Sequence, residues 1–335
     1  MFDIDLNDIK PNIKQVETDD IIEMTCSEEI LFLEKEYEAK KEILDLADEL
    51  DKLFVAYENQ RAIIQTRNEI PKDPLWIHYS MEAWTINETI KTLLDKFRKF
   101  FPKVFTYINS FVIIRTKASK LSCQKWLNIL LDTAKDQDKI DTIFNKSDTK
   151  SAKIEDVVNA INSADGAYKK FFDQANTVKG FKRVTEADKD KMQEIFVTPS
   201  EYQTFLDNKK KVDDALPSNE NQGATGFTYK DGAWDDAAKV KNLVDALDKV
   251  CTVLENTKRL QMTCDEMVRD LSKEQKGESA EKDMVKELND EKIKFLKELS
   301  KKVLSSMMES IGNLGSLAAK NCKMFCNQYE KGNEQ

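Results

Sequence analysis

The sequence is poor in the residues that interrupt helices. Its 335 residues include only 9 Gly and 6 Pro, and no proline occurs in the last 118 residues. Glycine and proline destabilise helix interiors, and 34% of the residues are charged, so this composition is typical of long helices with solvated faces. We find neither a strand-rich stretch nor an internal repeat. We therefore predict an all-α, elongated protein.

Histidine and paired cysteines are also scarce. The chain has a single histidine, His78, and six scattered cysteines: Cys26, Cys123, Cys251, Cys264, Cys322 and Cys326. None forms the close pairs that zinc sites need, so we predict no metal site and no cofactor. Cys322 and Cys326 are four residues apart and share one helix face, where a pair of buried thiols is expected.

Motifs of known enzyme classes are missing. There is no glycine-rich phosphate loop of the Walker or dinucleotide type and no zincin helix. His78 is better interpreted as a packing or surface residue than as a general base. We predict no catalytic residue and a protein that is not an enzyme. No uninterrupted apolar run has membrane-spanning length, and the acidic N-terminus does not resemble a secretory signal, which predicts a soluble protein made in a cytoplasm.

The charge of the chain changes sign at residue 82. Residues 1–82 hold 21 acidic and 9 basic residues, a balance of −12, whereas the other 253 residues have a balance of +3. An acidic leader before a mildly basic body suggests a segment that covers, solubilises or addresses the rest. Without the leader, the body is more compatible with polyanions.

The leader contains one long predicted helix, from about residue 27 to residue 68. Thr25 and Glu28 match a capping box, and apolar residues then recur at helical spacing. These residues are Ile30, Leu33, Tyr37, Leu44, Leu50, Phe54, Tyr57 and Ile64. Pro71 and Pro74 must end the helix, because proline removes a donor and disfavours helix at the preceding residue.

Further helices are predicted at about 83–101 and 118–135, with Pro102 kinking or restarting the first. Shorter elements follow in the remainder of the middle segment, 83–215, and residues 216–232 form the clearest loop. The C-terminal segment, 233–335, contains two long helical patterns, at about 233–275 and 280–329. At ~1.5 Å per residue each is roughly 65–75 Å long, which suggests an antiparallel hairpin with coiled-coil character.

The stretch 83–120 combines basic and aromatic residues. It has eight bases against two acids, together with Trp84 and five phenylalanines. The bases are Lys91, Lys96, Arg98, Lys99, Lys103, Arg115, Lys117 and Lys120. A basic amphipathic helix attracts phosphate backbones or anionic lipid surfaces, and the pattern does not distinguish DNA from a membrane. An ordinary core helix with a basic outer face is an equally good interpretation.

A short run, Ser80-Met81-Glu82-Ala83, is a candidate processing site. A protease that recognises a small residue, any residue and then Glu would cut after Glu82. Similar patterns occur elsewhere in the chain, but this one follows the proline-broken segment and coincides with the change of charge.

The order of these segments resembles that of the internal head proteins (inner virion proteins) of large-headed tailed bacteriophages. The matching residues are Ser80-Met81-Glu82-Ala83-Trp84 and Ile90-Lys91-Thr92-Leu93-Leu94-Asp95-Lys96-Phe97-Arg98-Lys99-Phe100-Phe101. The resemblance covers the whole chain in layout and is specific over about residues 78–120.

The resemblance implies a protein made in the host bacterial cytoplasm and located inside the virion head. Residues 1–82 would be a propeptide that targets the precursor to the prohead scaffold or capsid interior. A phage maturation protease would then cut between Glu82 and Ala83. The body would remain with the packaged DNA, bound without sequence specificity.

Two other functions fit the sequence. One is a cellular coiled-coil scaffold whose C-terminal hairpin pairs with a partner. The other is a membrane-active protein that inserts its Phe-rich helix at 97–114. A second copy of the chain is a further candidate partner.

Overall fold

The computed structural model describes residues 26–68, 76–133, 152–181, 199–215, 234–255, 257–274, 282–302 and 309–333. Every regular element in these ranges is helical, which confirms the all-α prediction. The elements are α1 (Cys26–Asn68), α2 (Trp76–Tyr107), the π-helix η1 (Ile108–Val112), α3 (Ile113–Asp132), α5 (Ile154–Gly180), α7 (Ser200–Ala215), α9 (Ala237–Glu255), α10 (Thr257–Glu274), α11 (Lys282–Lys302) and α12 (Glu309–Asn333).

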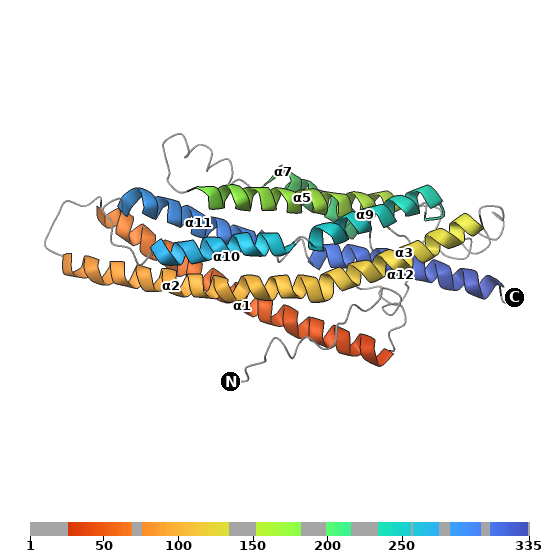
Figure 1. Cartoon of the computed structure of the whole chain (residues 1–335), viewed down its shortest axis with the longest axis horizontal. Helices are drawn as coiled ribbons and strands as arrows, with labels where there is room; N and C mark the ends of the chain where they lie inside the picture. The colour runs from red at the N-terminus through yellow and green to blue at the C-terminus, as the bar shows by residue number, and fades with distance from the viewer. Residues whose placement is uncertain are drawn as a thin grey trace.

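The helices run roughly along one long axis, so the molecule is elongated (Figure 1). α2, η1 and α3 follow one another as a nearly continuous helix along one side. α10 packs on α2 towards one end, whereas α9 and α12 pack on α3 towards the other. α5 packs on α9 and carries α7 on the opposite side. α1 lies against α2 at the outer edge of the assembly.

Two tryptophans connect the helices at the α3 end of the core. Trp126 and Trp234 are fully buried, and each needs an acceptor for its indole N–H. Trp126 donates to the carbonyl of Trp234 at 2.8 Å, and Trp234 donates to the carbonyl of Ala152 at 3.2 Å. The ring of Phe325 from α12 lies 5.4 Å from that of Trp126. This cluster joins α3 and α12 to the chain just before α5 and α9.

α1 and α2 pack through two matching heptad patterns. Along α1 the buried positions recur every seven residues, at Glu36, Ile43, Leu50 and Tyr57. Along α2 they recur at Ile86, Leu93, Phe100 and Tyr107, with the buried Phe97 and Val104 between them. A seven-residue apolar repeat on both helices is typical of coiled-coil packing. α1 is therefore built into the same hydrophobic core as the rest of the described chain.

The predicted boundaries of the second helix are wrong at both ends. α2 begins at Trp76 rather than near residue 83, and it runs through Pro102 to Tyr107. Pro71 and Pro74 precede that start, a place where proline is tolerated. Pro102 costs the helix about 3 kcal/mol, yet the neighbouring Phe100 and Phe101 are buried and hold the chain in place.

The C-terminal segment contains four described helices, α9 to α12, where two long ones were predicted. α9 packs on α3 and α5, α10 packs on α2 and α5, and α12 packs mainly on α3. The antiparallel hairpin remains a prediction. The predicted loop at 216–232 lies outside the described residues.

The predicted thiol pair is confirmed as buried. Cys322 and Cys326 lie in the interior on α12, and Cys322 lies against Cys123 of α3. Burial raises the pKa of the Cys326 thiol to about 11, and burial likewise raises that of Cys251 to about 11. Both are therefore protonated at neutral pH and behave as small apolar side chains.

The packing of α1 predicts unequal costs for two leucine truncations on the same helix. Leu50 is 1% exposed and Leu31 is 51% exposed. We expect Leu50→Ala to lower the free energy of unfolding by about 2–5 kcal/mol, because it leaves a cavity between α1 and α2. Leu31→Ala should change it by less than about 0.5 kcal/mol. Urea unfolding followed by circular dichroism measures both, and equal small effects would show that α1 does not share the core.

Candidate functional site

The basic residues predicted to contact DNA or a membrane lie on α2 and α3, and most of them are engaged within the molecule. Seven of the eight form ion pairs: Lys91 with Glu88, Lys96 with Glu49, Arg98 with Asp95, Lys103 with Glu42, Arg115 with Glu36, Lys117 with Glu255, and Lys120 with Asp248. Lys99 is exposed, and no ion pair joins it to another described residue.

Three of these bases are paired with the acidic helix α1. Glu49 pairs with Lys96, and Glu42, seven residues earlier, pairs with Lys103, seven residues later. The Lys103–Glu42 distance is 2.5 Å. This reciprocal spacing means that α1 and α2 run antiparallel, with one charge pair in each of two successive heptads. The charges flank the apolar contacts described above.

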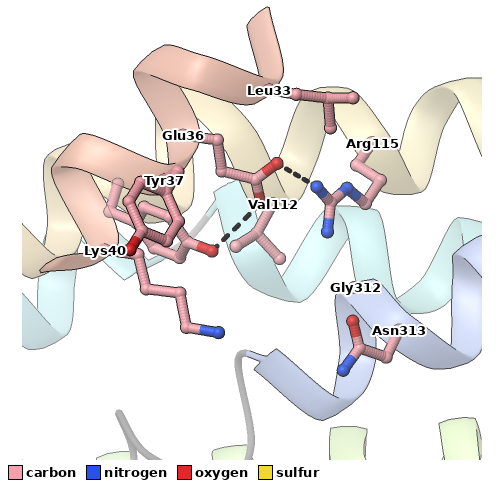
Figure 2. A pocket seen from close by; sticks show the side chains of 9 residues that line it. Leu33, Glu36, Tyr37, Lys40, Val112, Arg115, Gly312 and Asn313 are labelled. Atoms are coloured by element: carbon pink, nitrogen blue, oxygen red, sulfur yellow. Dashed lines mark hydrogen bonds and ion pairs between the residues drawn. The ribbon is translucent and has the colours of Figure 1, made fainter. Parts of the chain in front are cut away.

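Glu36 forms the buried member of this series. It is 6% exposed, and its carboxylate accepts a hydrogen bond of 3.1 Å from the hydroxyl of Tyr107. The other carboxylate oxygen pairs with Arg115. Figure 2 shows both interactions converging on Glu36. A buried carboxylate needs such partners, because an unpaired charge is costly in the interior.

The π-helix η1 explains how one carboxylate reaches both partners. In an unbroken α-helix, residues 107 and 115 would lie about 80° apart around the axis. A π-helical turn contains one extra residue, which brings position 115 close to the face of position 107. Glu36 therefore meets Tyr107 and Arg115 on the same side of the α2–η1–α3 helix. π-Turns of this kind occur frequently at functional sites.

A small pocket lies beside this contact. Its volume is about 190 Å³, and Leu33, Tyr37 and Lys40 of α1 line it together with Arg115 and Gly312–Asn313 (Figure 2). Pockets that enclose a drug-sized ligand or cofactor measure roughly 300–1,000 Å³. The pocket is therefore too small for such a ligand, and two of its charged groups, Glu36 and Arg115, pair with each other.

A second polar cluster holds the C-terminal half of α1 against α11. Asp290 is 6% exposed; its carboxylate accepts the hydroxyl hydrogen of Tyr57 and pairs with Arg61 at 3.0 Å. Burial and the charge of Asp290 raise the pKa of Tyr57 well above its ordinary value. Nearby, Lys297 lies 4.3 Å above the ring of Phe54. α1 is thus held by polar contacts near both ends.

The candidate cleavage run, Ser80, Met81, Glu82 and Ala83, falls within the first two turns of α2. The backbone there is helical, and the side chains of residues 76–85 lie outside those described. Proteases bind their substrates in extended form, so cutting at Glu82 requires the start of α2 to unwind locally. Helix ends open at lower free energy than helix centres, so this step is modest.

Among the described residues, no group of three or more His, Cys, Asp and Glu side chains is arranged to hold a metal ion. None of their helices is both long and apolar enough to cross a membrane.

Comparison with known proteins finds no relative. No family model, no curated protein and no solved structure matches the chain. The resemblance to phage internal head proteins therefore remains a prediction from the sequence.

The bases of this site could be recognised in the sequence, but the acids that pair with them were missed. Glu36, Glu42, Glu49 and Asp290 were not singled out. A signal for two of them was present, because Glu42 and Glu49 have the same seven-residue spacing as Lys96 and Lys103. Asp290 had no comparable signal, since its partners are more than 200 residues away.

The Asp290 cluster predicts a large stability loss from one substitution. Asp290→Ala leaves the hydroxyl of Tyr57 and the charge of Arg61 without their partner in a buried site. We expect the free energy of unfolding to fall by about 3–5 kcal/mol. The control is Asp95→Ala, which removes an exposed pair on α2 and should cost less than about 1 kcal/mol. Thermal and urea unfolding compare the two; similar losses would contradict the role given to Asp290.

Proposed function

We propose that this protein is a non-enzymatic structural component of a bacteriophage head. In this proposal residues 1–82 are an acidic leader that targets the precursor into the prohead and covers the basic helices. A maturation protease removes the leader after Glu82, and the body stays with the packaged DNA. The observation that carries the proposal is the pairing of α1 carboxylates with the bases that were predicted to contact a polyanion.

α1 covers the bases of α2 and α3 both by neutralising their charge and by occupying the space beside them. Lys96, Lys103 and Arg115 face α1, and their pairs neutralise them where a phosphate backbone would otherwise bind. Removal of residues 1–82 takes Glu36, Glu42 and Glu49 away and leaves a body of net charge +3. Binding to DNA through such residues is nonspecific and weakens steeply with salt.

Cutting and release are separate steps under this proposal. Leu50 and Tyr57 are buried against the body, and the Asp290 cluster holds α1 to α11. A leader cut after Glu82 therefore stays bound through these contacts, and its release requires them to open as well as a polyanion to compete for the bases of α2 and α3. The phosphates of DNA are negatively charged like the α1 carboxylates, and their concentration rises as DNA is packaged into the head.

The membrane-active alternative requires a larger rearrangement. Phe97, Phe100, Phe101 and Phe105 are each at most 3% exposed, so the aromatic side of α2 faces the core. Insertion of this helix into a bilayer would require the core to open. Contact with DNA requires release of the pairs that α1 makes with Lys96, Lys103 and Arg115, but no insertion of these phenylalanines into a bilayer.

The proposal predicts that weakening two charge pairs increases DNA binding by the full-length chain. Glu42→Gln with Glu49→Gln removes two carboxylates at half-exposed positions and releases Lys96 and Lys103. We expect tighter binding to duplex DNA. The slope of log affinity against log salt should become more negative by about 1–2, because each extra phosphate contact contributes about −0.9. Fluorescence anisotropy over a salt series measures both.

The matched control is Glu38→Gln with Asp45→Asn, which makes the same change in net charge on exposed positions of α1. If the control gains as much affinity as the test variant, the effect is one of net charge and the covering role fails. Adding Lys96→Gln and Lys103→Gln to the test variant should abolish the gain. Absence of binding by the test variant at low salt would also contradict the proposal.

Cleavage is tested on protein taken from its native particle. Intact-mass spectrometry should find a species that begins at Ala83, because the particle contains the processed body. Full-length protein alone would contradict the processing step, whatever the outcome of the DNA measurements. A body that begins elsewhere would show that another bond is cut.

A further inference from the structure

The outer face of α1 carries apolar side chains that the fold leaves uncovered. Nine large apolar residues are exposed among the described side chains, and seven of them lie on α1: Ile30, Leu31, Leu33, Tyr37, Leu44, Val55 and Ile63. Their concentration on one helix sets α1 apart, because single exposed apolar residues are normal on any protein surface.

Four of these residues form one stripe. Ile30, Leu33, Tyr37 and Leu44 are spaced by three, four and seven residues, which places them along a single face of the helix. The face buried against α2 contains Ile43 and is turned roughly 80–140° away around the axis, and Leu33 and Tyr37 lie at the rim of the pocket described above. The N-terminal half of α1 therefore has two apolar faces, of which only one is occupied within the molecule. In Figure 1 this half of α1 runs along the outer edge of the assembly.

The charges beside the stripe indicate what covers it. Glu34 and Lys41 are both exposed and lie seven residues apart on the same flank of the stripe. When two copies of this segment lie antiparallel about Tyr37, Ile30 meets the partner's Leu44. On the flank, Glu34 meets the partner's Lys41, and the twofold axis repeats both contacts. A parallel arrangement would instead place like charges at the same level.

We propose that two copies of this chain associate through the outer faces of their α1 helices, as an antiparallel pair centred on Tyr37. The interface is isologous, so each chain contributes the same residues. Its contact segment spans about 15 residues, roughly 20 Å of helix, which is smaller than a standard protein interface. The dimer is therefore weak and forms with increasing concentration. It leaves the pairs made by Glu42 and Glu49 in place, because those residues point towards α2.

Sedimentation equilibrium of the full-length chain over a micromolar to near-millimolar range tests this pairing. We expect a monomer–dimer equilibrium in the unmodified protein. Leu33→Glu with Leu44→Glu should weaken the dimer at least tenfold, because it puts charges into the apolar contact. The matched control, Val55→Glu with Ile63→Glu, changes two exposed residues of α1 outside the stripe and should dimerise as before. All four positions are exposed, so the far-ultraviolet circular dichroism of each variant should match that of the unmodified chain.

A charge swap tests the antiparallel register. Lys41→Glu alone should weaken the dimer, because Glu34 then meets a carboxylate. Adding Glu34→Lys to the same chain should restore it. A protein that is monomeric at every concentration would overturn the proposal and leave the stripe to a different partner. A dimer that survives Leu33→Glu with Leu44→Glu, or a charge swap that fails to restore pairing, would equally overturn it.

Discussion

The pairing of α1 carboxylates with bases on α2 and α3 is the interaction on which the rest of this account depends. Glu49 and Glu42 meet Lys96 and Lys103 in an antiparallel register, and Glu36 meets Arg115 at the buried end. Exposed ion pairs contribute little stability on their own, so the apolar heptad contacts of α1 provide most of its attachment. The charges determine the register and the partner, whereas the apolar contacts determine the strength.

The fold places the acidic N-terminal segment against the basic part of the chain. Residues 1–82 have a net charge of −12 and the remaining residues one of +3, and acidic side chains of α1 pair with basic side chains of α2 and α3. In the function proposed here, the acidic flanks and apolar inner face of α1 let it occupy the place where a polyanion would bind. Because α1 also contributes to the core, it is more than a soluble extension. α1 packs on the rest of the chain through both apolar and charged contacts.

The helical class of the protein and the main core residues of α2 could be predicted from the sequence. Few glycines and prolines interrupt the chain, and the apolar residues of α2 recur with a clear 3.6-residue period. The first helix was placed at 27–68 and extends over Cys26–Asn68. The face of α1 that packs inside was not predictable from period alone. Ile30, Leu33, Tyr37 and Leu44 fit the helical pattern as well as Leu50 and Tyr57 do, yet only the latter are buried.

The bases of the candidate site could be recognised from their number and spacing, but their partners depend on tertiary pairing. Local sequence does not specify which helix lies beside α2, so the roles of Glu36 and Asp290 emerge only in the fold. The π-turn at η1 has the same origin. It lies between Tyr107 and Arg115, which both contact Glu36 of α1.

Hydrogen exchange of the full-length chain, resolved by mass spectrometry, tests most directly whether α1 is bound in solution as described. The account predicts that amides between residues 43 and 61 of α1 exchange as slowly as those between residues 93 and 107 of α2, through one cooperative opening. Fast exchange across α1, with α2 still protected, would mean that the acidic helix does not cover the basic one.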